Sequence, residues 1–449
     1  MLVRVHRDQD ATSWSPSPIC RGQTLRILVT ALGLTRWQEV DSSMTSDQSL
    51  GLRIKRARKR RQLTQEQLAE KAEVSVDLVR KLEQEIRHTA SMSSLTRIAR
   101  ALDVDVPQLL GQKSTIEPMV DEEAVGILAI RDELTSLSYF PGLADQEVFN
   151  DEPPTVAGLR MALAHAESIR QHGSFAQLGV MLPGLVAEAR AAIRELEGDD
   201  RVAAYGLLSE VIQIASTMLT ALGKPDIGYI GLIRAQEAAE QSGDELLQAM
   251  NVSALSWVFF KQGRLADAET AALRKAEQLG PDFVRGSAEQ LAVWGILMLR
   301  AGSAAVRNKQ VERSEEHMSL ARAAAARVGT DHNIYATPFG PTNASIAAVN
   351  AAVESERFEY ALELAKSVPV NGWVSPTFRA RHLLDVAIAH SELDQDEAAT
   401  AQLLAAERVA PEWMRYHTLS RQTVHELAER ARRRQTPLLR LADRLNIEL

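Results

Sequence analysis

The chain has 449 residues, of which 45% are apolar and only 5% aromatic, and its formal net charge is −8. This length suffices for two or three domains, and a composition rich in Ala and Leu favours packed helices over a β-sandwich or barrel. The sequence has no apolar run of about 18 residues, which argues against a membrane protein. The single cysteine, Cys20, fits a reducing compartment, so we expect a cytoplasmic protein.

Residues 1–48 mix Pro, Ser, Trp and Arg without a lasting period, and we expect a disordered leader. Met44 stands just before the first patterned segment, so we interpret it as the natural start. A signal peptide is the alternative for "LRILVTALGL", but Arg26 interrupts that stretch and no small-residue cleavage site follows it.

The charge is unevenly distributed along the chain. Residues 50–113 contain 14 Lys or Arg and 8 Asp or Glu, residues 1–49 are neutral, and residues 114–449 carry a net charge of −14. A compact basic block in an otherwise acidic protein indicates a polyanionic partner for that block alone.

The basic block predicts several short helices. They are expected at 50–61, 65–72, 76–84, 93–104 and 106–111. Thr64 is the predicted N-cap of the second helix, with Gln67 as its capping-box partner, and Ser75 is the predicted N-cap of the third. Two short helices joined by a three-residue turn describe a helix-turn-helix, whose second helix would enter the major groove of DNA.

The outward residues of the predicted reading helix have chemistry that base edges can use. Val76 can make a methyl contact, and Asp77 can accept a hydrogen bond from cytosine. Arg80 and Lys81 can donate hydrogen bonds to guanine. We expect phosphate contacts at the start of the preceding helix and just beyond the reading helix. With the cap of the reading helix, these further DNA-binding candidates are Thr64, Gln65, Ser75 and Arg87.

The stretch "LTQEQLAEKAEVSVDLVRKLEQ", followed by "LTRIARALDVDVPQLLG", resembles the lambda-repressor/Cro type of helix-turn-helix domain, the xenobiotic-response-element family. The resemblance implies a five-helix DNA-binding domain that acts as a homodimer on double-stranded operator DNA. It also implies a phosphate contact for Gln65 and base-facing positions for Val76, Asp77 and Lys81. The family commonly has Gly where this chain has Glu73, so a left-handed turn there would cost roughly 1 kcal/mol.

Most of the remaining chain reads as helix pairs. Polar turn signals near residues 172, 222, 262, 300, 355 and 392 separate them. The unit "NVSALSWVFFKQGRLADAETAALRKAEQLGP" resembles a tetratricopeptide repeat, and the whole chain resembles an actinobacterial class of regulators in which such a solenoid follows the helix-turn-helix. One unit cannot bury its own apolar face, so we expect stacking into an α-solenoid and an all-α fold.

The predicted domains are a leader at 1–48, the DNA-binding domain at 49–112, a linker with a bridging helix at 113–153, the solenoid at 154–436 and a tail at 437–449. The first helix of each pair would line the concave face. On that face, an effector, either a peptide or a small molecule, would meet amide side chains and an aromatic ring. The candidates are Gln213, Trp257, Asn343 and Asn350.

Two readings of the function follow. The first is a sequence-specific transcriptional regulator, and the alternative is an interaction scaffold whose solenoid binds a protein partner while DNA binding is secondary. The sequence has no phosphate-cradling glycine loop, and "HELAE" at His425 lacks the second histidine of a zinc-protease helix. We therefore expect no enzymatic activity, no cofactor and no metal.

Overall fold

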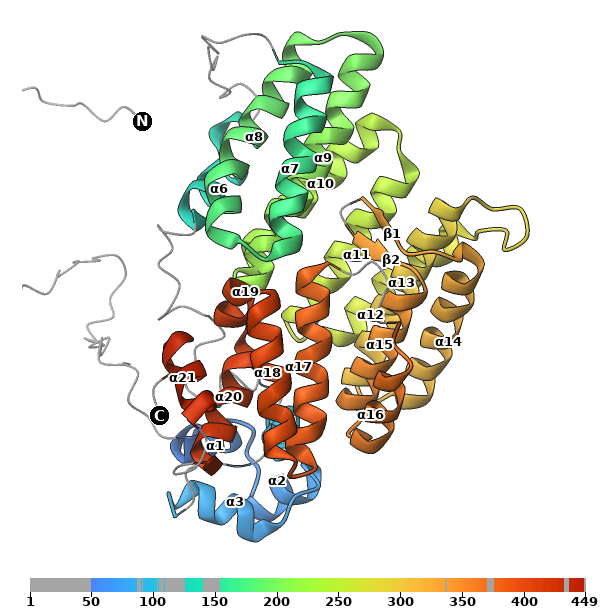
Figure 1. Ribbon diagram of the computed structural model, residues 1–449. Helices are drawn as coiled ribbons and strands as arrows, with labels where there is room; N and C mark the ends of the chain where they lie inside the picture. Colours follow the sequence, from blue (N-terminus) through green and yellow to red (C-terminus); the bar gives the residue numbers. More distant parts are fainter. Residues whose placement is uncertain are drawn as a thin grey trace, which may run out of the picture. The chain divides into compact units, whose positions relative to one another are not determined.

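The computed structural model describes residues 50–86, 90, 92–102, 104, 109, 126–139, 154–335, 337–369, 375–431 and 436–447 (Figure 1). The expected leader and Arg87 lie outside the described residues, as does the expected fifth helix apart from Leu109. The fold is all-α, a helix-turn-helix domain followed by helical repeats, and the described residues contain only two short strands.

The first described helices agree with the sequence prediction to within a few residues. They are α1 (Leu50–Arg60), α2 (Gln65–Lys71), α3 (Val76–Glu83) and α4 (Met92–Ala101). The Thr64 side chain accepts a hydrogen bond from the Gln67 amide and completes a capping box, while Ser75 caps α3 by accepting from the Leu78 amide. Polar side chains therefore satisfy orphan amides at the start of both helices.

The apolar residues of these helices form one small core. It includes Ile54, Leu68, Val79, Leu82, Leu95, Ile98 and Leu102. Leu52 does not belong to this core, since it is 38% exposed. The residue that faces α3 is Gly51, where an added Cβ would lie 1.9 Å from the Leu82 carbonyl oxygen. The close approach of α1 and α3 thus requires glycine.

A second series of helices begins with α6 (Ile127–Leu134) and the 3-10 turn η1 (Leu137–Tyr139). The helix pairs follow as α7 (Val156–His172), α8 (Phe175–Glu195), α9 (Gly198–Ala221), α10 (Pro225–Ser242), α11 (Glu245–Lys261), α12 (Leu265–Leu279), α13 (Ala288–Arg307), α14 (Val311–Val328), α15 (Pro341–Glu354), α16 (Phe358–Lys366), α17 (Pro376–Glu392) and α18 (Asp396–Val409). The chain then forms α19 (Pro411–Tyr416), α20 (Thr418–Ala431) and α21 (Thr436–Arg444). The segment expected as a tail therefore contains most of α21, whose Leu438 and Leu441 are fully buried.

Most of the predicted turn signals coincide with helix ends. Gly173, Gly223 and Gly263 have positive φ angles between successive helices, as do Glu356 and Asp394. The signal near residue 300 is wrong, because it lies inside α13. Glycine at 302 serves packing there, since an added Cβ would lie 2.9 Å from Met318 of α14.

The first helices of successive pairs contact one another in chain order. Contacts join α7 to α9, α9 to α11, α11 to α13, α13 to α15 and α15 to α17. Contacts also join α17 back to α7. The Ala176 amide in α8 donates to Glu412 of α19 at 2.8 Å, and the Phe175 and Tyr416 rings meet edge to face. The start and the end of the repeat series therefore pack against each other.

A β-hairpin interrupts the helices between α14 and α15. Strands β1 (His332–Ile334) and β2 (Thr337–Phe339) pair antiparallel, with Asn333 opposite Pro338. This segment is the "HNIYATPFG" stretch, and Phe339 is fully buried against α13. Within the described part of the chain, α9 alone is long and apolar enough to cross a membrane. Two thirds of its most apolar window (67%) is buried in the protein, as in the core helix of a soluble domain.

Candidate functional site

The outward face of α3 carries the predicted DNA-reading residues. Asp77, Arg80 and Lys81 are exposed, whereas Val76 is half-buried at the first position of the helix. Lys81 forms an ion pair with Asp77 at 2.7 Å, one helical turn apart. Exposed pairs of this kind contribute at most about 1 kcal/mol, so a stronger anion can replace Asp77 as the partner of Lys81.

An ion pair that the sequence analysis missed connects α1 to α3. Arg58 donates to both carboxylate oxygens of Glu83, from Nε at 2.6 Å and from Nη2 at 2.8 Å. Gln65, at the start of α2, donates to the same carboxylate at 2.8 Å. The side-chain amide of Gln65, which was predicted to contact a phosphate, is thus bound to Glu83. One polar network therefore links three helices.

The basic run of α1 is divided between two roles. Arg58 faces inward, and Arg53 donates from Nε to the Leu109 carbonyl at 2.6 Å. Arg56, Lys59 and Arg60 are exposed. Only part of the positive charge in this run is therefore placed to meet a polyanion. Sequence counting could not separate the two groups, because the distinction depends on which side chains face Glu83 and Leu109.

The turn between α2 and α3 has the geometry that the resemblance required. Glu73 lies in the left-handed region, with φ of 53°. The Val74 amide donates to the Ala69 carbonyl at 3.0 Å, which closes the end of α2. The helix-turn-helix geometry is thus kept without glycine, at a cost of roughly 1 kcal/mol.

The predicted effector residues occupy different environments. Gln213 of α9 is buried and donates to Asn251 of α11 at 2.8 Å, and Asn251 donates in turn to Ser209. The side-chain amide of Asn350 in α15 donates to both oxygens of Asp385 at 3.2 Å. These bonds join neighbouring first helices and occupy the amides that a ligand would use.

Asn343 and Trp257 are placed differently. Asn343 is 6% exposed, and among the described residues its Nδ2 has no hydrogen-bond partner. Trp257 is half-buried, with Lys261 Nζ and Arg300 Cζ each 5.9 Å from its ring centroid. The four predicted effector residues therefore do not form a single polar row, and Trp257 stands beside cationic groups that the sequence analysis did not select.

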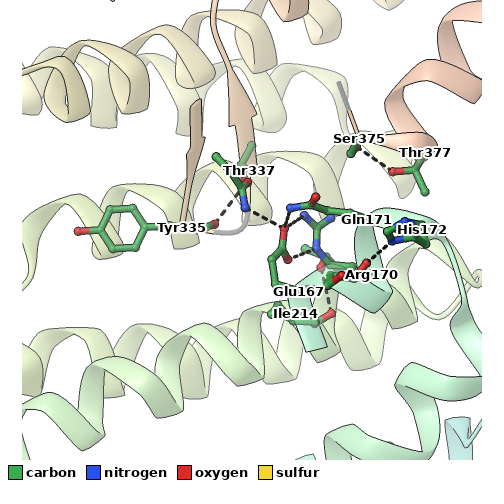
Figure 2. Close-up of polar contacts among 12 residues, drawn as sticks. Glu167, Arg170, Gln171, His172, Ile214, Tyr335, Thr337, Ser375 and Thr377 are labelled. Carbon is green, nitrogen blue, oxygen red and sulfur yellow. Dashed lines mark hydrogen bonds and ion pairs between the residues drawn. The ribbon is translucent and has the colours of Figure 1, made fainter. Parts of the chain in front are cut away.

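Acidic and basic side chains of α7 lie close to the β-hairpin. Figure 2 shows Glu167, Arg170 and Gln171 of α7 near Tyr335 and Thr337 of the hairpin segment. Glu167 accepts from Arg170 at 2.6 and 2.7 Å and from Gln171 at 2.7 Å. Asn333 of β1 adds a bond to the same carboxylate at 3.2 Å. The Glu167 carboxylate is therefore fully engaged.

A second carboxylate anchors the hairpin to α11. Asp244 caps α11 by accepting from the Leu246 and Leu247 amides, and it also accepts from the Tyr335 hydroxyl at 2.6 Å. Burial, with this bond to Asp244, raises the pKa of Tyr335. Burial raises the pKa of nearby Glu210 to about 7, assisted by the charges of Asp244 and Glu167.

Several cations of the first helices are close enough to influence one another. Burial, with the charge of Arg170, lowers the pKa of Arg300 to about 10. Burial, followed by the charges of Arg381 and Lys261, holds the pKa of His417 well below its usual range. Arg381 is paired with Asp385 at 3.0 Å.

In the described ranges, His, Cys, Asp and Glu side chains form no group suited to a metal ion.

Comparison with known proteins supports a helix-turn-helix in the front domain. Residues 54–109 match the helix-turn-helix family model. The immunity repressor protein of Bacillus phage phi105 is 41% identical over 69 residues, which are 15% of this chain and 47% of that protein. The chain thus spans about half the length of this curated relative.

Two solved structures are similar over most of the chain. One is Bacillus thuringiensis PlcR in complex with the peptide PapR7 and DNA, with a TM-score of 0.35, 12% identity and coverage of 79% of this chain and 98% of that one. The other is ComR from S. thermophilus in complex with DNA and its signalling peptide ComS, with a TM-score of 0.26, 12% identity and coverage of 80% and 99%.

Proposed function

We propose that the protein is a transcriptional regulator that binds specific double-stranded DNA through α3. The observation that carries the proposal is the exposed outward face of a capped helix in a helix-turn-helix, with Asp77, Arg80 and Lys81 free of the core. Guanidinium and ammonium groups suit guanine O6 and N7, and Asp77 suits cytosine N4. The match of residues 54–109 to a helix-turn-helix family supports the same reading.

The exposed cations of α1 supply the non-specific part of binding. Lys59 and Arg60 are available to phosphates, since neither of them is buried. The logarithm of the association constant falls linearly with the logarithm of the salt concentration, with a slope near −0.9 for each phosphate that a cation neutralises. A homodimer would place two reading helices about 34 Å apart on one face of the DNA.

The experiment is a salt series of binding between the purified protein and its own upstream DNA, compared with scrambled DNA of equal length. Arg80→Ala and Lys81→Ala should each weaken specific binding by about 1–3 kcal/mol and relax preference at one position. Lys366→Ala, in α16, removes the same charge at an exposed site of the repeat region and serves as the control. The proposal fails if upstream and scrambled DNA bind alike at every salt concentration while the protein is folded.

The second part of the proposal is that the repeat helices bind an effector, a peptide or a small molecule. It is supported by the half-buried Trp257 beside cations and by the buried Asn343, whose Nδ2 has no hydrogen-bond partner within the part of the chain that the structure describes. A buried donor without an acceptor costs about 1–3 kcal/mol, which a ligand can recover. Effector binding would change DNA affinity by a coupling of about 1–3 kcal/mol.

The scaffold alternative predicts a different result. In that case the repeat helices would bind a protein partner, and substitutions on α3 would leave the protein's activity unchanged. Sedimentation of the protein with and without upstream DNA separates the two readings, because only a regulator forms a stoichiometric dimer–DNA complex. The exposed charges of α3 favour the regulator.

A further inference from the structure

We propose that Arg300 of α13, together with the face of Trp257 in α11, forms a subsite for an organic anion, a carboxylate or phosphate carried on an apolar body. This inference rests on the proposed effector site and gives it a chemical class. Arg300 was not among the effector-binding residues that the sequence indicated.

Hydrogen bonding within the described residues uses only part of the Arg300 guanidinium. A guanidinium has five N–H donors in a planar fork and no acceptor. Among the described residues, Arg300 donates from Nε to the hydroxyl of Ser253 at 3.2 Å, and the structure assigns it no carboxylate partner within ion-pair distance. The side chain is partly accessible, so the outer part of the fork can receive a ligand.

The charge of Arg300 is in an unfavourable environment. Arg170 of α7 lies near enough to repel Arg300, and burial adds to the cost of its charge. The Glu167 carboxylate accepts hydrogen bonds from Arg170, Gln171 and Asn333, and it forms no ion pair with Arg300. A half-buried cation among cations is costly unless an anion joins it. The fork geometry matches the two oxygens of a carboxylate or phosphate.

An aromatic side chain lies beside the guanidinium. The Trp257 ring centroid lies 5.9 Å from Arg300 Cζ, and the neighbouring first helices α9 and α13 contact α11. An aromatic face beside a cation accepts the apolar part of a ligand whose charged end meets the fork. Ser253 is 1% exposed and fixes the orientation of Nε from the same helix as Trp257. The juxtaposition therefore selects an anion with an apolar body over a small inorganic ion.

The test uses the full chain without DNA and follows the melting temperature at constant ionic strength. The probes are N-acetyl-phenylalanine, its neutral amide and phenyl phosphate, with chloride as the reference anion. We expect a saturable rise in melting temperature with one or both anions and none with the amide. Arg300→Gln should weaken this binding by about 10- to 100-fold, the loss expected for one charged hydrogen-bonded contact.

Arg322→Gln, at an exposed position of α14, removes the same charge and should leave the response intact. If Arg300→Gln fails to fold, Arg300→Lys and Trp257→Phe replace it, since they keep the charge and the aromatic face, respectively, and should weaken binding. Trp257 also provides a fluorescence change that Trp257→Phe removes. An equal response of Arg300→Gln and the parent protein, or of the acid and its amide, or no saturable response to either anion, would overturn the proposal. Intact DNA binding in the same preparation would show that the proposed regulator stands without it.

Discussion

The Arg58 guanidinium donates hydrogen bonds to both oxygens of the Glu83 carboxylate and thereby connects α1 to the end of α3. The Arg58 and Glu83 side chains are 11% and 1% exposed, so the pair is shielded from water. Gln65 completes the network from α2. The orientation of the proposed reading helix therefore depends on a buried polar contact in addition to the apolar core.

Replacing Glu83 with Ala should destabilise the front domain. The change leaves the Arg58 charge shielded and unpaired, which costs about 3–5 kcal/mol for a buried pair. Hydrogen exchange of the full chain should become faster at the amides of α1 to α3 and stay unchanged in α9 and α13. Glu85→Ala, at an exposed neighbouring position, is the control. Equal protection of α1 to α3 in both variants would argue that the pair contributes nothing.

The same carboxylate predicts a loss of stability in acid. Burial alone would raise the pKa of Glu83, but hydrogen bonds from Arg58 and Gln65 outweigh it and the pKa is lowered. A carboxyl whose pKa is lower in the folded state stabilises the fold above its unfolded value and loses that contribution as pH falls through the folded value. The protection factors of the α1 to α3 amides, which correct for the pH dependence of intrinsic exchange, should therefore fall below about pH 4.5. Glu83→Gln, which cannot ionise, should remove that acid dependence, and a parallel decline in both proteins would contradict the assignment.

Glu210 should show the opposite dependence. Its pKa is raised to about 7 by burial and by the charges of Asp244 and Glu167. A carboxyl whose pKa is higher in the folded state destabilises the fold progressively as pH rises from its unfolded value to its folded value. Glu210→Gln should thus raise the melting temperature at pH 8 and change it little at pH 4. At pH 8 the substitution should raise the free energy of unfolding by roughly 1–3 kcal/mol, because each tenfold change in the acid dissociation constant corresponds to about 1.4 kcal/mol. A gain of equal size at both pH values would contradict the electrostatic cause.

The front domain could be predicted closely because its signals are local. The caps Thr64 and Ser75, the turn at Glu73 and the core positions Val79 and Leu82 follow from spacing over a few residues. The predicted DNA contacts remain predictions, although the structure leaves the outward face of α3 exposed.

The repeat region was predictable as helix pairs but not in its interior. Whether Gln213 faces a ligand or Asn251, and whether a glycine ends a helix or lies under Met318, depends on partners about 16 to 40 residues away. Arg300 was overlooked for the same reason, because only the fold shows that Ser253 and Trp257 are its neighbours. The arginine lacks a carboxylate partner on its own helix, which is the one local signal that could have drawn notice.

Gly295 of α13 should be essential for the packing of the β-hairpin. An added Cβ would lie 2.1 Å from Cζ of Phe339, whose ring is fully buried and cannot move without opening the core. Gly295→Ala should therefore lower stability, by about 1–3 kcal/mol or more for overpacking. Gly184→Ala in α8 is the matched control, because an added Cβ there meets nothing within 4 Å. Alanine at that helical position should stabilise by about 0.5–1 kcal/mol. Thermal denaturation of the two variants should thus give shifts of opposite sign. Phe339→Leu added to Gly295→Ala should recover part of the loss by making room for the methyl group. If Gly295→Ala and Gly184→Ala instead shift the melting temperature in the same direction, the close approach of Phe339 to α13 does not limit stability.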